Sequence, residues 1–176
     1  DSIISLSNQL KIKSHKRKKS FANDTTRSEL VVLNILDEIQ SIKKNFEYLI
    51  LLQPTSPLRT CEHIDSACMK IIKDSAETLI SVKETPNTIL KALTLDESGK
   101  LVPGFKKEFP FMPRQELPKA FMPNGAIYIV NIKHFIDNKS FLSSNNSFIV
   151  MDENSSHDID ELSDIKRVES ILELRK

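Results

Sequence analysis

The sequence is poor in glycine and cysteine, and it has no long hydrophobic run. Its three glycines, Gly99, Gly104 and Gly125, are scattered and do not form a glycine-rich phosphate-binding loop. The two cysteines, Cys61 and Cys68, lie two turns apart on a predicted helix, roughly 10 Å along its axis, which is too far for a disulfide. They predict reduced thiols in a cytoplasmic protein and, without further cysteines, no metal site of their own. No apolar stretch approaches the ~20 residues of a transmembrane helix.

The charge balance is close to neutral, which argues against functions that depend on a strongly charged chain. The formal net charge of +1 predicts neither a nucleic-acid partner nor a membrane surface. The basic run at 16–19 is too short to change this and is typical of a solvated loop. With 39% hydrophobic and 28% charged residues, the chain predicts a single globular domain over residues 1–176.

The most informative stretch is the segment from Tyr48 to Arg59, which reads YLILLQPTSPLR. The apolar run at 48–52 predicts a strand that is buried on both faces. Pro54 and Pro57 remove backbone donors and end this strand, leaving a polar loop with two hydroxyls and an arginine. Such a loop at the carboxyl end of a strand is where open α/β sheets bind ligands. A plain strand-to-helix turn with solvated polar residues explains the same pattern equally well, so both interpretations stay open.

The remaining apolar periodicity predicts a mixed α/β fold with three layers and one sheet. A strand at 48–52, a helix at 61–73 and a strand at 78–82 follow one another at the spacing of a right-handed βαβ unit with parallel strands. The other predicted elements are a turn at Asn23–Thr26, a helix at 28–44, strands at 89–93, 126–130 and 148–151, a hairpin-like turn at 96–100, and a closing helix at 162–172.

A proline-rich segment at 103–123 is predicted to be irregular, because five prolines interrupt it. A segment of this length inside a domain is typical of a functional or interface loop. It contains Arg114 and Gln115, and an arginine held among prolines suits a phosphate or carboxylate ligand. A solvated loop arginine is the commoner alternative.

Asn124 and Gly125 directly precede the apolar strand at 126–130. Asn124 is placed to offer its amide to a ligand at the edge of that strand, but an Asn-Gly pair is also a strong turn signal. Lys91 lies in an apolar stretch and is a weaker candidate for a ligand contact.

Two carboxylates, Asp158 and Asp160, come just before the closing helix. In an extended backbone, residues two apart project to the same side, so this pair suits a magnesium ion that completes its shell with waters and substrate phosphates. Asp164, four residues on, is able to face the same way. Spacing alone favours the other interpretation, in which Asp158 or Asp160 caps the helix N-terminus.

Four motifs together resemble one enzyme family. QPTSPLR at 53–59, PRQELP at 113–118, PNGAIYI at 123–129 and DID at 158–160 occur in the order and approximate spacing of the N-acylneuraminate cytidylyltransferases, also called CMP-sialic acid synthetases. Relatives that act on legionaminic and pseudaminic acids look alike. The resemblance covers essentially the whole chain. Any one motif alone would be weak, but the four together are specific.

The resemblance implies a Rossmann-like, three-layer nucleotidyltransferase fold with a mostly parallel sheet. Such enzymes dimerise through an extended, partly swapped segment, which corresponds here to residues 84–120. They transfer CMP from CTP to a nonulosonic (sialic-type) acid, with magnesium, and release pyrophosphate. The implied partners are CTP, the sugar acid and a second copy of the chain.

The resemblance also implies roles for individual residues. Gln53, Lys91, Gln115 and Asn124 correspond to substrate-binding positions, Lys91 less securely than the others. Arg114 corresponds to a residue that both binds substrate and takes part in catalysis. Asp158 and Asp160 correspond to the magnesium ligands, and Asp160 also to a catalytic residue.

One part of the family pattern has no counterpart in this sequence. The family begins with a strand, a phosphate-binding loop and a helix, and the chain resembles the family only from the point where that portion ends. We therefore expect the chain to be part of a longer enzyme. The alternative is a catalytically inactive homologue that acts as a binding or dimerisation remnant. A nucleotidyltransferase for another sugar acid, such as Kdo, fits the RQELP and PNGAIYI motifs less well.

Overall fold

The computed structural model describes residues 2–23 and 25–175, which group into two compact units. The first unit spans Asp1–Glu47 and Ile132–Ser140, and the second spans Tyr48–Asn131 and Phe141–Lys176. Among the described residues, no helix has both the length and the apolar character needed to cross a membrane.

The first unit is helical. The predicted helix at 28–44 is wrong as a single element, because the backbone leaves the helical region at Ile39, with φ −106° and ψ 73°. Asp37 and Glu38 fall at the end of the first piece, where negative charge opposes the helix dipole, and its last turn has no basic residue. The elements of this unit are α1 (Ser2–Gln9), the 3-10 helix η1 (Lys19–Phe21), α2 (Ser28–Glu38), α3 (Gln40–Asn45) and α5 (Ile132–Asn138).

The turn predicted at Asn23–Thr26 is present in the part that the structure describes. Asn23 Oδ1 accepts hydrogen bonds from Thr25 N at 3.1 Å and from Thr26 Oγ1 at 2.7 Å. Asp24, which belongs to the same predicted turn, lies outside the described residues.

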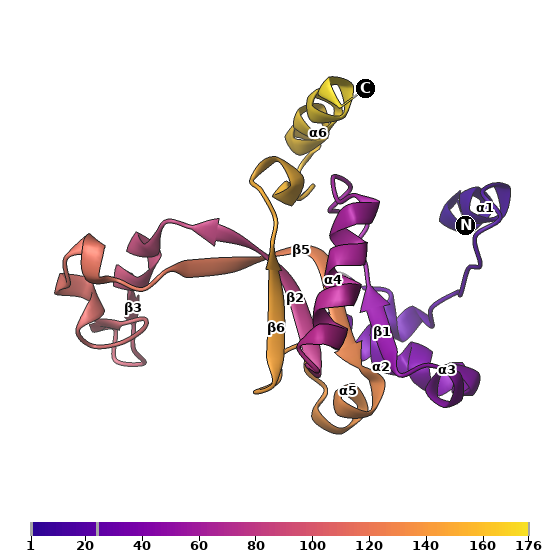
Figure 1. Cartoon of the computed structure of the whole chain (residues 1–176), viewed down its shortest axis with the longest axis horizontal. Helices are drawn as coiled ribbons and strands as arrows, with labels where there is room; N and C mark the ends of the chain where they lie inside the picture. Colours follow the sequence, from indigo (N-terminus) through magenta and orange to yellow (C-terminus); the bar gives the residue numbers. More distant parts are fainter. Residues whose placement is uncertain (1, 24, 176) are drawn as a thin grey trace. The chain divides into compact units, whose positions relative to one another are not determined.

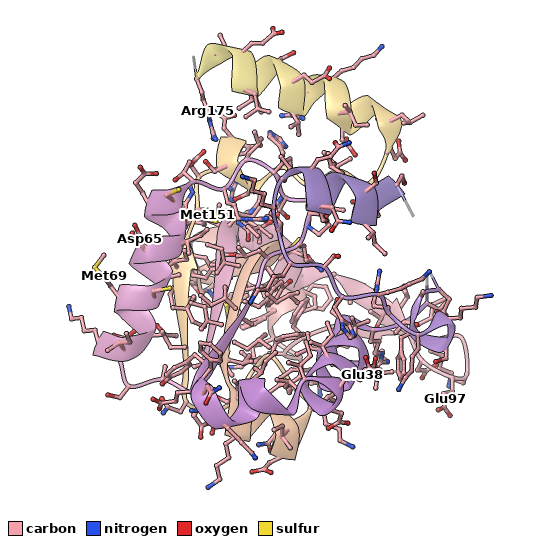
Figure 2. All side chains as sticks on the ribbon, turned by 90° about the vertical axis from the view of Figure 1, so that its right-hand side faces the viewer. Glu38, Asp65, Met69, Glu97, Met151 and Arg175 are labelled. Carbon is pink, nitrogen blue, oxygen red and sulfur yellow. The ribbon has the colours of Figure 1, made fainter. Side chains whose placement is uncertain are left out.

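The basic run contributes to an ion pair within the first unit. Lys18 Nζ lies 2.8 Å from Glu38 Oε1, and His15 Nε2 lies 2.6 Å from Glu38 Oε2. The hydrogen bond from Lys18, ahead of that from His15, holds the pKa of Glu38 below its usual range. Figure 2 labels Glu38. Lys18 is thus paired within the protein, which agrees with a surface loop rather than a binding patch.

The second unit is built on a four-stranded sheet in the order β1-β5-β2-β6 (Figure 1). The α/β class is confirmed, but the prediction of a mostly parallel sheet is wrong. The central β5 runs antiparallel to both of its neighbours, and only β2 and β6 pair in parallel. The strands are β1 (Tyr48–Leu51), β2 (Thr78–Thr85), β5 (Ala120–Asn131) and β6 (Asn146–Val150).

The physical reason for this error is the insertion of β5. β1 and β2 do run in the same direction, as a βαβ unit requires, but β5 lies between them and bonds to both. Periodicity reports that a strand is buried but not which strand lies beside it. The three-layer, Rossmann-like arrangement stays a prediction.

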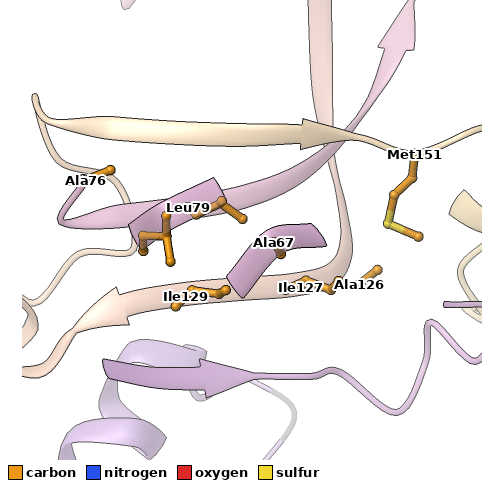
Figure 3. Close-up of a cluster of buried hydrophobic side chains, with 8 residues drawn as sticks. Ala67, Ala76, Leu79, Ala126, Ile127, Ile129 and Met151 are labelled. Atoms are coloured by element: carbon orange, nitrogen blue, oxygen red, sulfur yellow. The ribbon is translucent and has the colours of Figure 1, made fainter. Parts of the chain in front are cut away.

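One helix, α4 (Cys61–Lys73), covers a face of the sheet and forms the main core, as the sequence predicts (Figure 3). The helix starts at a capping box, in which Thr60 N donates to His63 Nδ1 at 3.1 Å. Leu79 and Ile127 in the sheet are fully buried, and burying each of them stabilises the fold by about 1.5–3 kcal/mol. The cluster consists of Ala67, Ile71, Ala76, Leu79, Ala126, Ile127, Ile129 and Met151.

Residues 84–120 extend from the sheet along a ribbon formed by β2 and β5, and β3 lies at the end of this ribbon (Figure 1). The strand predicted at 89–93 is wrong over most of its length, because Asn87–Lys91 is a 3-10 helix, η2. The Asn87 amide donates to the carbonyls of Arg114 and Leu117 and ties that turn down. The other elements of the segment are β3 (Leu93–Leu95), β4 (Leu101–Pro103), and the 3-10 helices η3 (Phe109–Phe111) and η4 (Arg114–Glu116).

Two further predictions for this region have clear outcomes. The hairpin turn at 96–100 is confirmed, with Asp96 Oδ1 accepting from Ser98 N and Lys100 N, each at 2.9 Å. The irregular segment predicted at 103–123 ends too late, because β5 already begins at Ala120 and includes Pro123. A proline is tolerated in this strand because it lies next to a break in the pairing with β2.

The chain ends in the 3-10 helix η5 (Asn154–Ser156) and the predicted helix α6 (Leu162–Leu174). Figure 2 shows Arg175 at the end of α6. Its guanidinium donates to the Leu58 carbonyl at 2.7 Å and to Ser155 Oγ at 2.9 Å.

Candidate active site

The site is built around an irregularity in the pairing of β2 and β5. Ile80 pairs with Tyr128, but Val82 pairs with Pro123, so four residues of β5 lie opposite Ser81 alone. The Ser81 hydroxyl replaces one of the backbone hydrogen bonds that the bulge interrupts, because it accepts a hydrogen bond from Ile127 N at 2.7 Å. Bulges of this kind turn side chains out of the regular pleat and are common next to active sites.

Asn124 is the hub of the bulge and is only 5% exposed. Its Oδ1 accepts from Ser81 Oγ at 2.6 Å and from Ala126 N at 3.3 Å. Its Nδ2 donates to Ser156 Oγ at 2.9 Å. The bonds fix the orientation of the amide, which helps to line the cleft described below. A buried amide held by three partners is costly to remove, because each partner would be left unsatisfied.

Gly125 brings three parts of the chain together. Its φ is +75°, and a Cβ at this position would lie 2.7 Å from Gln53 Oε1, 3.0 Å from Ser56 Oγ and 3.8 Å from Asp158 Oδ2. Only glycine permits this approach without strain. Sequence reasoning treated Gly125 as half of a turn signal, and that Asn-Gly pair was the only sign of the bulge.

The polar loop after β1 is attached to the bulge by Arg59. One guanidinium nitrogen, Nη1, donates to the carbonyls of Gln53 at 2.6 Å, Ser56 at 2.9 Å and Ala126 at 3.4 Å. Burial lowers the pKa of the Arg59 guanidinium. Because Nη1 bonds to backbone carbonyls of both the loop and β5, Arg59 positions the loop. Ser56, fully buried, lies within hydrogen-bonding reach of Asp158 Oδ1, 3.2 Å away.

The DID motif joins the same site from the other side. Ile159 N donates to the Thr55 carbonyl at 2.8 Å, which anchors the segment to the loop after β1. Asp158 and Asp160 both line the cleft that opens here. Apart from the Ser56 contact of Asp158, neither carboxylate has a hydrogen-bond or ion-pair partner among residues 2–23 and 25–175.

The prediction that Asp158 or Asp160 caps the last helix is wrong. The capping box of α6 is made by Glu161 and Asp164. Asp164 Oδ2 accepts from Glu161 N at 2.8 Å and from Asp160 N at 3.0 Å, and these hydrogen bonds hold the pKa of Asp164 below its usual range. The two carboxylates of the DID motif are therefore not used by the helix.

The carboxylate pair fits a magnesium ion. Its donors are oxygens, which this hard cation prefers, and magnesium takes only one or two carboxylates from a protein. Within the described part of the chain, no group of three or more His, Cys, Asp or Glu side chains would hold a metal by itself.

A cleft of about 470 Å³ brings four of the predicted residues together. They are Gln53, Asn124, Asp158 and Asp160. Sequence reasoning missed Lys83 as a lining residue, since nothing marks one lysine of a strand as facing a site. Arg114 and Gln115 instead line a separate pocket of about 610 Å³ at the base of the projecting segment, and Lys91 ends η2. The roles predicted for these last three residues stay predictions.

His157 lines the same cleft. Burial, followed by the nearby charge of Arg167, lowers the pKa of its imidazole. Its Nε2 is buried and has no hydrogen-bond partner within the described residues.

Several known proteins are similar in sequence to most of this chain. No protein-family model matches the chain. The chain is 30% identical over 162 residues to the CMP-N,N'-diacetyllegionaminic acid synthase of Legionella pneumophila, covering 91% of this chain and 68% of that one. It is 25% identical over 150 residues to the pseudaminic acid cytidylyltransferase of Campylobacter jejuni, covering 85% and 64%. It is 31% identical over 130 residues to the N-acylneuraminate cytidylyltransferase of Escherichia coli, covering 72% and 30%.

These relatives define a class of enzymes that attach a cytidylyl group to sugar acids. The chain belongs to the N-acylneuraminate cytidylyltransferase family, including its legionaminic and pseudaminic acid branches. It spans about two thirds of the length of the two bacterial sugar-acid relatives named first.

Proposed function

We propose that this protein transfers CMP from CTP to a nonulosonic acid and releases pyrophosphate. The observation that carries the proposal is the cleft at the β5 bulge, which is lined by two amides, Gln53 and Asn124, together with the carboxylates of Asp158 and Asp160. The names of the relatives support the substrate class.

In this reaction an anomeric hydroxyl oxygen of the sugar acid attacks the α-phosphorus of CTP. The bond from that phosphorus to the bridging oxygen breaks, and the electron pair leaves with pyrophosphate. Asp158 and Asp160 would hold a magnesium ion, which supplies charge neutralisation for the phosphates. Gln53 would orient the sugar acid, and the Asp160 carboxylate would accept the proton of the attacking hydroxyl.

We also propose that residues 84–120 join two copies of the chain and that the protein is cytoplasmic. The projecting segment carries exposed apolar side chains, with Phe111 91% and Leu95 68% exposed. Arg114 and Gln115 belong to this segment and do not line the cleft of their own chain, so they would contribute to an active site only by entering the cleft of a second copy.

We expect sedimentation analysis to show a dimer, and we expect the Phe111→Ser substitution to weaken the association of its two copies. A monomer at micromolar concentration would contradict the proposal.

The activity is tested by measuring pyrophosphate release from CTP and magnesium with N-acetylneuraminic, legionaminic and pseudaminic acids. The assay uses the full-length polypeptide that the gene encodes. We expect one acid to give a CMP-sugar product that is detected by mass spectrometry. A folded protein that forms no product with any of the three acids would overturn the proposal in favour of a binding remnant.

A further inference from the structure

The two carboxylates of the DID motif are held differently, and the difference comes from Ser56. The Ser56 hydroxyl is fully buried and lies 3.2 Å from Asp158 Oδ1. The Asp160 carboxylate has no hydrogen-bond or ion-pair partner within the described part of the chain. One member of the carboxylate pair is therefore fixed by the protein, whereas the other is free to turn. The proposed mechanism assigns no part to Ser56.

The hydroxyl of Ser56 has one proton and two acceptors within reach. Its Oγ lies 3.2 Å from Asp158 Oδ1 and 3.3 Å from the Asn124 carbonyl oxygen. An ionised carboxylate is a stronger acceptor than a neutral carbonyl, so the proton is directed to the aspartate. Ser56 is 0% exposed, so bulk water does not compete for this hydrogen bond, and the low polarity of its surroundings strengthens it.

The loop that carries this hydroxyl is itself held in place. Arg59 Nη1 donates to the Ser56 carbonyl at 2.9 Å and to the Ala126 carbonyl of β5 at 3.4 Å. Ile159 N donates to the Thr55 carbonyl at 2.8 Å, which fixes the backbone of the DID motif beside the same loop. Donor and acceptor therefore both project from anchored backbone, and an aspartate side chain that turned away would lose its bond to the serine.

We infer that Ser56 is a positioning residue of the metal site, whose hydroxyl holds the Asp158 carboxylate in one orientation before a metal ion arrives. The inference rests on the proposed function and deepens it. Carboxylates that bind metals are commonly hydrogen-bonded in turn, and removing such a partner lowers metal affinity by about 10–100-fold. A carboxylate that is free to turn loses side-chain freedom on binding, and the bond from Ser56 removes this cost at Asp158.

The test measures the binding of Mn²⁺ alone to the full-length polypeptide, from the signal of the free ion in electron paramagnetic resonance. Mn²⁺ takes the same oxygen ligands as Mg²⁺, and the measurement needs neither substrate nor turnover. We expect Ser56→Ala to weaken binding by about tenfold. Asp158→Asn should also weaken binding. Adding Ser56→Ala to that variant should cause no further loss, because the hydroxyl acts only through this carboxylate.

Ser147→Ala is the matched control. Ser147 is another buried serine that donates to an aspartate, Asp74, and both residues lie outside the cleft lining. The control should keep the Mn²⁺ affinity of the unmodified protein. Ser56→Cys keeps a weaker donor at the same position and should lose less affinity than Ser56→Ala, so it tests the inference even if the alanine variant does not fold.

The inference is overturned if neither Ser56 variant, shown to be folded by its circular dichroism, binds Mn²⁺ less tightly than the unmodified protein. It is also overturned if the effects of Ser56→Ala and Asp158→Asn add, since a purely structural serine would weaken the site whichever side chain stands at position 158. In both cases the unmodified protein still binds the ion, and the proposed function stands. An unmodified protein that binds no Mn²⁺ would remove the metal site from the proposed function, and the inference with it.

Discussion

Asp160→Asn is expected to lower the kcat of CMP transfer by at least about 100-fold while leaving the fold intact, since removing one electrostatic contact to the transition state commonly costs that much. The Asp160 carboxylate has no hydrogen-bond or ion-pair partner within the described residues, so its loss leaves no buried group unsatisfied. The free energy of unfolding should therefore change by less than about 0.5 kcal/mol. The substituted amide keeps the size of the side chain but removes the charge that would bind magnesium and accept the proton.

Steady-state kinetics over a range of magnesium concentrations provide the measurement. We expect the variant to need more magnesium for half-maximal rate, and its kcat to stay low even at saturation. Asp65→Asn is the control, because Asp65 is an exposed carboxylate on α4 (Figure 2) and should leave both quantities unchanged. Normal kcat and magnesium dependence in Asp160→Asn would exclude Asp160 from the metal site and from catalysis.

Gly125→Ala is expected to destabilise the protein more than Gly99→Ala, although both positions have almost the same backbone conformation. The φ angles are +75° and +77°, and a Cβ at Gly99 would meet nothing within 4 Å. Gly99→Ala should thus cost only the backbone strain, about 1–2 kcal/mol. At Gly125 the new methyl would also collide with Gln53 Oε1 and Ser56 Oγ, and overpacking adds about 1–3 kcal/mol.

The two variants also differ in their expected effect on the site. Ser56 is fully buried, so the collision at Gly125 is relieved most readily by moving the Gln53 side chain. Displacing that amide should raise the KM for the sugar acid, whereas Gly99→Ala should leave it unchanged. Denaturant midpoints and sugar-acid kinetics measure both effects. Equal destabilisation of the two variants would show that the close approach at Gly125 does not occur in solution.

The site shows why some of its parts were visible in the sequence and others were not. The polar loop after β1 and the DID motif were both predicted as candidates, because turn residues after an apolar run and paired carboxylates are local patterns. The bulge was marked only by the Asn-Gly pair, which predicted a turn, because the bulge itself depends on how β5 pairs with β2. Lys83 went unnoticed for the same reason.

The capping of α6 shows that local sequence patterns do not decide which of several neighbouring acidic residues caps a helix. Four acidic residues, Asp158, Asp160, Glu161 and Asp164, precede or begin α6, and each has the chemistry of a cap. The structure uses Glu161 and Asp164 and leaves Asp158 and Asp160 to the cleft. What separates them is the bond from Ile159 N to the Thr55 carbonyl, which fixes the segment against a loop about a hundred residues earlier.

The sequence by itself determined the class of the fold, the positions of α4, α6, β1 and β5, and the motifs that relate the chain to its family. These follow from local periodicity, turn chemistry and short motifs, which are encoded within a few neighbouring residues. The prediction that β1 is buried on both faces is wrong, because β1 lies at the edge of the sheet and its residues are half-buried or exposed. Only the tertiary structure decided that β5 lies between β1 and β2, that Gln53, Gly125 and Asp158 meet, and that Lys83 faces them. Strand order and register depend on the pairing of residues far apart in the chain, and single-strand patterns carry no record of the partner.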